Sequence, residues 1–82
     1  MSSDEDILNR LNVIFRDVLD DEDINLSPTT TAADVQGWDS LNHVRLMVSA
    51  EREFKVKKFT AAELSRLKNV GDLVGLLKGR GV

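Results

Sequence analysis

Apolar residues recur at the three-to-four-residue spacing of an α-helix along most of this 82-residue chain. The first run begins after Ser3 and Asp6, which resemble a helix-capping pair, and predicts a helix of about four turns. A second helix is predicted from near Ser40 to about Phe54. The apolar positions of the first helix are Ile7, Leu8, Leu11, Ile14, Phe15, Val18 and Leu19.

Two shorter helices follow, each with a capping pair at its start. Thr60 and Glu63 form a capping box before a short third helix, "TAAELSRL", and Asn69 and Asp72 precede a last helix, "VGDLVGLLKG". Four helices, one of them short, with no strands and no internal repeat predict an all-α four-helix bundle. A chain of this size has room for one hydrophobic core, so residues 1–82 are expected to form a single domain.

A long first loop, about residues 20–39, joins the first two helices. Its only proline and its Ser/Thr cluster keep it irregular. Thr31 and Asp34 could cap a short turn within it. A long loop held against the bundle is more often functional than idle. The residues expected to hold it there are Ile24, Leu26, Val35 and Trp38.

Composition excludes several classes of protein. With no cysteine, the chain has no disulfide, no thiolate nucleophile and no cysteine zinc site. Its acidic N-terminus is unlike a secretory signal or transit peptide and no apolar run could span a membrane, so we expect a cytosolic protein. Residues 1–41 carry ten acidic and two basic residues, and residues 42–82 carry four and nine. The bases are scattered and the net charge is -3, which argues against nucleic acid as a partner.

The second predicted helix carries more apolar surface than it needs to face a core. At 100° per residue its apolar positions cover an arc of roughly 220°, whereas a surface helix needs a stripe of little more than 100°. Leu41, Val44 and Val48 are the surplus, and they predict either contact with a partner surface or tighter wrapping by the first loop. The core-facing positions are Leu46, Met47, Ala50 and Phe54.

No catalytic site is evident around Ser40. The segment "GWDSL" lacks the second glycine of a nucleophile elbow, G-x-S-x-G. His43 is the only histidine, and the sequence offers no group that would orient it as a base for Ser40. We therefore expect His43 to be a partly buried histidine with one hydrogen bond, and the chain not to be an enzyme.

A metal site is not predicted either. Asp21, Asp23 and Asn25 have EF-hand-like spacing in the first loop. Leu26, however, stands at the glycine position, and Ala32 stands at the position of the final carboxylate. The segment is an acidic loop and at most a weak cation binder.

Ser40 is left as a side chain that could itself be modified. A helix start has free N–H groups and the positive end of the helix dipole, which favour an attached phosphate group. Asp39 would repel that phosphate unless an enzyme brings a metal or bases to the site during the transfer. The segment "GWDSLNHVRLMVSAEREF", with "FTAAEL" and "KNVGDLVGLL" beyond it, resembles the acyl carrier proteins over nearly the whole chain.

This resemblance implies the same four-helix bundle, with a long first loop and a short third helix. It implies that a phosphopantetheinyl transferase attaches 4′-phosphopantetheine from coenzyme A to Ser40, with Asp39 as a recognition residue. The arm would supply the thiol that the chain lacks and carry acyl groups as thioesters. The implied partners are an acyl-loading enzyme and a ketosynthase or acyltransferase, and we expect a monomer. The implied acyl-chain lining is Leu46, Ala50, Leu64 and Leu67.

Two features depart from the carriers of fatty-acid synthases, whose second helix is strongly acidic. This helix carries Arg45 and Arg52, and the connection "FKVKKFT" is more basic and one residue longer than usual. Both predict a dedicated carrier for a specialised fatty-acid, lipid or polyketide pathway. The alternatives are a peptidyl or aminoacyl carrier of a non-ribosomal pathway, and an unmodified helical adaptor that needs Ser40 only as a helix cap. The predicted partner-docking residues are Leu41, Val44, Arg45, Val48 and Arg52.

Overall fold

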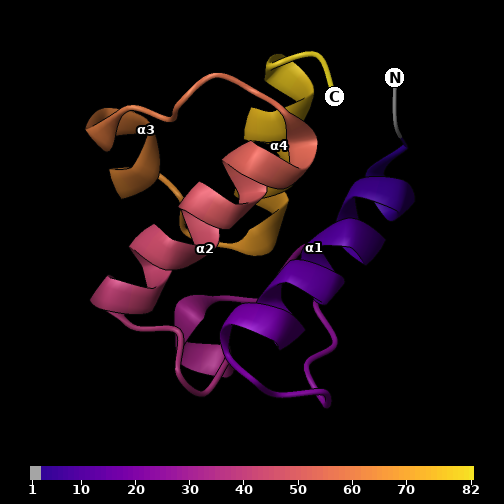
Figure 1. The fold of residues 1–82 in the computed structure, drawn as a ribbon, viewed down its shortest axis with the longest axis vertical. Coiled ribbons are helices and arrows are strands. Elements are labelled where there is room, and N and C mark those ends of the chain that lie inside the picture. The colour runs from indigo at the N-terminus through magenta and orange to yellow at the C-terminus, as the bar shows by residue number, and fades with distance from the viewer. Residues whose placement is uncertain (1–2) are drawn as a thin grey trace.

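Helices make up most of the protein in the computed structural model, which describes residues 3–82 (Figure 1). A short 3-10 helix, η1, interrupts the long connection between the first two α-helices. No strand occurs within residues 3–82, so the predicted all-α bundle with a long first loop and a short third helix is confirmed. Met1 and Ser2 of the predicted domain lie outside the described residues. The elements are α1 Asp4–Val18, η1 Ala32–Asp34, α2 Ser40–Phe54, α3 Ala61–Ser65 and α4 Val70–Gly79.

The predicted capping pairs stand at the starts of α1, α3 and α4. In each pair a side-chain oxygen accepts a hydrogen bond from a backbone N–H of the first turn. These N–H groups have no partner within their own helix, so the caps favour helix initiation at those residues. The bonds are Asp6 N to Ser3 Oγ (3.1 Å), Glu63 N to Thr60 Oγ1 (3.1 Å) and Asp72 N to Asn69 Oδ1 (2.9 Å).

The third helix ends earlier than its apolar pattern predicted. It stops at Ser65 because the next two N–H groups bond to carbonyls only three residues back. Arg66 N donates to the Glu63 carbonyl at 3.2 Å, and Leu67 N donates to the Leu64 carbonyl at 3.4 Å. Bonds of this kind tighten the chain and end an α-helix. The result is a five-residue helix with no fully buried side chain.

A single hydrophobic core lies between α1, α2 and α4. α1 contacts both of the other helices, and the ribbon shows α2 lying between α1 and α3 in this view (Figure 1). The four positions of α2 predicted to face the core are all buried, so that prediction is confirmed. The innermost side chains are Ile7, Leu11 and Phe15 of α1, Leu46, Met47 and Ala50 of α2, and Val70, Leu73 and Leu77 of α4.

The first loop is held against this core, as predicted. Ile24, Leu26 and Val35 are buried. Two further bonds that the sequence did not reveal run from the loop to α1. The buried Asn12 accepts a hydrogen bond from Leu26 N at 2.7 Å, and Arg16 Nε donates to the Ile24 carbonyl at 2.7 Å. A buried side-chain amide needs such a partner, so Asn12 fixes where the loop crosses α1.

The same loop also closes the start of α4. Val70 N donates to the Thr30 carbonyl at 2.9 Å, and Gly71 N donates to the Pro28 carbonyl at 2.8 Å. A Cβ at position 71 would lie 2.8 Å from that carbonyl oxygen, which explains the glycine there. The loop is therefore bonded to both α1 and α4, and these bonds fix its course up to the start of α2.

Candidate functional site

Ser40 is the first residue of α2, and its side chain is exposed. The cap of the helix is the preceding residue. Asp39 has extended backbone angles (φ −109°, ψ −174°), and its Oδ1 accepts a hydrogen bond from Asn42 N at 2.8 Å. The helical adaptor reading, in which Ser40 would serve as the cap, is therefore wrong on this point. Among residues 3–82 the Ser40 hydroxyl has no hydrogen-bond partner and is free for chemistry.

The turn before Ser40 is locked by its own backbone and by Asn42. Gly37 has a φ of +91°, a left-handed conformation that is strained for residues with a side chain. Its carbonyl accepts hydrogen bonds from Asp39 N at 3.0 Å and from Asn42 Nδ2 at 2.7 Å. Sequence reasoning missed Asn42, although a polar amide in the first turn of a helix was an available signal. The locked turn holds Ser40 at the helix start.

Trp38 and His43 form a pair beside Ser40. Trp38 Nε1 donates a hydrogen bond to His43 Nδ1 at 3.0 Å, and the two rings stack with centroids 6.0 Å apart. Trp38 also forms a T-shaped pair with Phe15, with ring centroids 4.9 Å apart. His43 is half-buried with one hydrogen bond, as predicted. Because its Nδ1 is occupied by Trp38, the geometry offers no base oriented by a carboxylate of the kind found in a catalytic triad.

A shallow hollow of about 430 Å³ opens beside the Ser40 side chain. Three segments meet there: the end of the first loop, the start of α2 and the connection between α3 and α4. An extended group attached to Ser40 would have room to lie against this surface, next to the Trp38 and His43 rings. The lining residues are Ala32, Trp38, Asp39, Ser40, His43 and Leu67.

Only one residue of the predicted acyl-chain lining borders this hollow. Leu67 does so, whereas Leu64 packs partly buried against the core. Leu46 and Ala50 are fully buried. In this conformation the four residues do not share an opening with Ser40, and the acyl-chain lining stays a prediction.

The outer side of α2 is exposed. Leu41 is 71% exposed, Val44 52% and Val48 42%. The alternative that the first loop wraps over these three residues is therefore wrong. Arg45 and Arg52 are exposed as well. The five predicted docking residues are thus all available to a partner on one helix.

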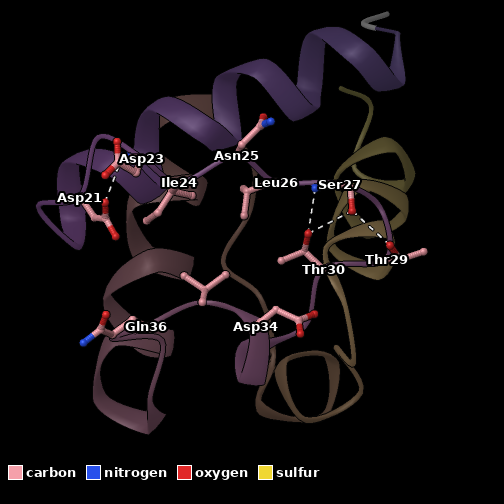
Figure 2. A pocket seen from close by; sticks show the side chains of 11 residues that line it. Asp21, Asp23, Ile24, Asn25, Leu26, Ser27, Thr29, Thr30, Asp34 and Gln36 are labelled. Atoms are coloured by element: carbon pink, nitrogen blue, oxygen red, sulfur yellow. Dashed lines mark hydrogen bonds between the residues drawn. The ribbon is translucent and has the colours of Figure 1, made fainter.

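The first loop borders a second hollow, of about 500 Å³ (Figure 2). Asp21 and Asp23 lie at one end of it, where Asp23 N donates to Asp21 Oδ1 at 3.0 Å, and Asp34 lies well apart from them. At the other end, Ser27 and Thr30 bond to each other. Within residues 3–82 no group of three or more potential ligands is arranged to hold a metal ion.

An ion pair joins Glu63 of α3 to Arg80, the residue that follows α4. Arg80 Nη1 and Nη2 donate to the two carboxylate oxygens of Glu63 at 2.8 and 2.5 Å, and the guanidinium lies 5.4 Å from the Phe59 ring centre. The Arg80 bond, helped by the Thr60 N–H, lowers the pKa of Glu63 from 4.5 to about 2. The same carboxylate raises the pKa of Arg80. A bidentate pair of this kind fixes orientation as well as distance.

No helix within residues 3–82 combines the length and the apolar character needed to cross a membrane.

Comparisons with known proteins point to one kind of site. The family described as "Phosphopantetheine attachment site" matches residues 9–77. Among solved structures, the solution NMR structure of a holo acyl carrier protein from Geobacter metallireducens is similar to this chain, with a TM-score of 0.83. The two share 47% sequence identity over 90% of this chain and 84% of the other. No curated protein gave a significant match.

Proposed function

The chain belongs to the acyl carrier proteins, the family with a phosphopantetheine attachment site, and we propose that Ser40 is its attachment residue. Proteins of this family carry covalently attached phosphopantetheine and are carriers rather than catalysts. The arm supplies a thiol, which this cysteine-free chain lacks, as the point of thioester formation. The observation that carries the proposal is the free, exposed hydroxyl of Ser40 at the first position of a 15-residue helix.

The surroundings of Ser40 fit an attached phosphodiester. The first turn of α2 presents backbone N–H groups and the positive end of the helix dipole, both of which favour an anion. The Asp39 carboxylate is held in place by the hydrogen bond that it accepts from the Asn42 N–H. We assign Asp39 two roles: it caps α2, and it gives the phosphopantetheinyl transferase a recognition carboxylate, where a transferase-bound metal or base would offset its charge.

The pathway is proposed to be a specialised one. Arg45 and Arg52 make the exposed side of α2 less acidic than that of fatty-acid-synthase carriers, and the basic connection before α3 adds to this difference. We propose a dedicated carrier of fatty-acid, lipid or polyketide intermediates, loaded by its own acyl-loading enzyme and serving a ketosynthase or acyltransferase. A single domain over residues 1–82, a monomer and a cytosolic location complete the proposal.

The attachment is tested by intact mass spectrometry after incubation with coenzyme A and a phosphopantetheinyl transferase. The parent protein should gain one phosphopantetheine, and Ser40→Ala should gain none while keeping its helical circular dichroism. Ser65→Ala is the matched control, because Ser65 is also an exposed serine on a helix. Mass gain by Ser40→Ala, or none by the parent, would contradict the proposal. The acyl group on protein isolated from its own cell then identifies the cargo and separates acyl from aminoacyl loading.

A further inference from the structure

The two acidic side chains of α2 are both used within the protein. Glu51 Oε2 accepts a hydrogen bond from Phe59 N at 2.6 Å, which ties it to the connection before α3. Glu53 lies on the side of α1, where its Oε1 is 3.6 Å from Arg10 Nη2 and its carbonyl accepts from the same nitrogen at 2.8 Å. Both carboxylates are therefore engaged by groups outside α2, although the Glu53 side chain stays 56% exposed. The net charge summed along α2 therefore does not describe the charge on the surface that a partner contacts.

Within residues 3–82, the outward side of α2 carries two charged side chains that bond to no other element, Arg45 and Arg52. Leu41, Val44, Arg45, Val48 and Arg52 follow a spacing of three, four, seven and eleven residues, which places them on one stripe. We call these five residues the outer stripe. Among residues 3–82, Arg45 Nη1 bonds only to the Asn42 side chain, at 3.3 Å, and Arg52 has no ion pair.

The outer stripe starts next to Ser40, so an enzyme acting on a group attached there would contact it. We infer that the partner enzyme presents an apolar recess bordered by carboxylates. The inference rests on the proposed carrier function and names the kind of partner that function requires. Three exposed apolar side chains supply the area to be buried, and two guanidinium groups select carboxylates at its edge.

Charge favours a protein partner over an anionic polymer or lipid surface. Two arginines make a small positive patch on a chain whose net charge is -3 and whose first 41 residues carry ten acids. Such a patch can orient a partner protein at short range, but the acidic rest of the molecule would repel an extended anionic surface.

The test uses one ketosynthase with a basic carrier-binding surface and a second form of it in which those basic residues are replaced by glutamate. Activity of both forms on a small-molecule thioester shows that both are competent. Acyl transfer is then measured with carrier whose complete loading has been verified by intact mass. The parent carrier should favour the acidic form, and Arg45→Glu with Arg52→Glu should favour the basic form. Two exposed ion pairs predict a change of about 2- to 30-fold in kcat/KM for each form.

Two matched controls separate the outer stripe from general effects. Lys57→Glu with Lys58→Glu makes the same change in net charge at exposed positions outside α2 and should shift the preference less than the arginine variant does. Val44→Ser should slow transfer, whereas Val13→Ser, at a valine of α1 that is 63% exposed, should not. The charge preference should weaken as salt rises above about 0.1 M, where the screening length is about 10 Å.

The inference is overturned if the arginine variant keeps the parent's preference, or if the lysine variant reverses it as strongly. Failure of the proposed function would look different, because no variant would then gain the mass of phosphopantetheine. If the loaded parent shows no preference between the two enzyme forms, the carrier function stands and the acidic partner does not.

Discussion

The consecutive helices α2 and α3 are held to the rest of the protein by different kinds of contact. α2 buries four side chains in the core, whereas α3 has no fully buried residue. Apart from the partly buried Leu64, α3 is positioned by its capping box, by the Glu63–Arg80 pair and by Phe59 just before it, which is buried and bonded to Glu51. Core packing can hold a helix from one side and leave its opposite face free. Polar contacts hold a helix only while each partner is present and correctly charged.

The largest expected effect comes from removing core packing beneath α2. Leu46→Ala should lower the free energy of unfolding by about 2–5 kcal/mol, because it deletes a fully buried side chain and leaves a cavity. Denaturant titration followed by circular dichroism measures this. Leu41→Ala is the control on the same helix, and at 71% exposure it should change stability by less than about 0.5 kcal/mol. Equal losses for the two variants would refute the division of α2 into an inner and an outer side.

A smaller effect is expected at the N-terminal cap of α2. Asp39→Ala should cost about 1 kcal/mol, since it removes the acceptor of the Asn42 N–H. Ser40→Ala should cost clearly less in the same titration, because its hydroxyl caps nothing. A larger loss for Ser40→Ala than for Asp39→Ala would show that the serine is the cap after all.

The third effect is local to α3. Arg80→Gln removes the partner of Glu63, so the backbone amides of Ala61 to Ser65 should exchange with solvent faster while amides of α2 keep their protection. Hydrogen exchange measured by NMR resolves the two helices. Lys78→Gln is the control, because its exposed ion pair with Asp4 joins α4 to α1 and does not include α3. Uniformly faster exchange in both helices would mean that α3 is not a separately held unit.

The smallest effect is a dependence on pH confined to α3. The pKa of Glu63 is lowered from 4.5 to about 2 in the folded protein. A carboxylate with a depressed folded pKa stabilises the fold above its ordinary pKa and loses that contribution as pH falls towards the folded value. Protection of α3 amides should therefore decline between about pH 4.5 and 2, and Glu63→Gln should remove that decline. A Glu63→Gln protein with an unchanged pH response would assign the effect to another group.

Features that depend on neighbouring residues were predictable from the sequence. The spacing of Leu46, Ala50 and Phe54 correctly identified the inner side of α2, because a helix repeats its faces within a few residues. The choice between Asp39 and Ser40 as the cap was not readable in this way. Both residue types cap helices, and the decision depends on which one has extended backbone angles after the Gly37 turn.

Features that join distant parts of the chain were not predictable. Asn12 and Leu26 meet across 14 residues, and Glu63 and Arg80 meet across 17. No periodic pattern marks such a pair, since each is created by the packing of whole elements. The contacts of Glu51 with Phe59 and of Glu53 with Arg10 also join distant parts of the chain. Because these contacts occupy the two carboxylates of α2, the arginines of the outer stripe are left without a carboxylate partner within residues 3–82.

The Trp38 pair beside Ser40 gives the protein a built-in optical signal. Trp38 is the only tryptophan, so the intrinsic emission of the chain comes from one indole, which packs against the Phe15 ring and the His43 ring. That indole borders the same hollow as the Ser40 hydroxyl. A group added to Ser40 would change the polarity and the quenchers around the indole, and with them the intensity and wavelength of its fluorescence. Arm attachment and acyl exchange could thus be followed continuously, in unlabelled protein, from a single residue.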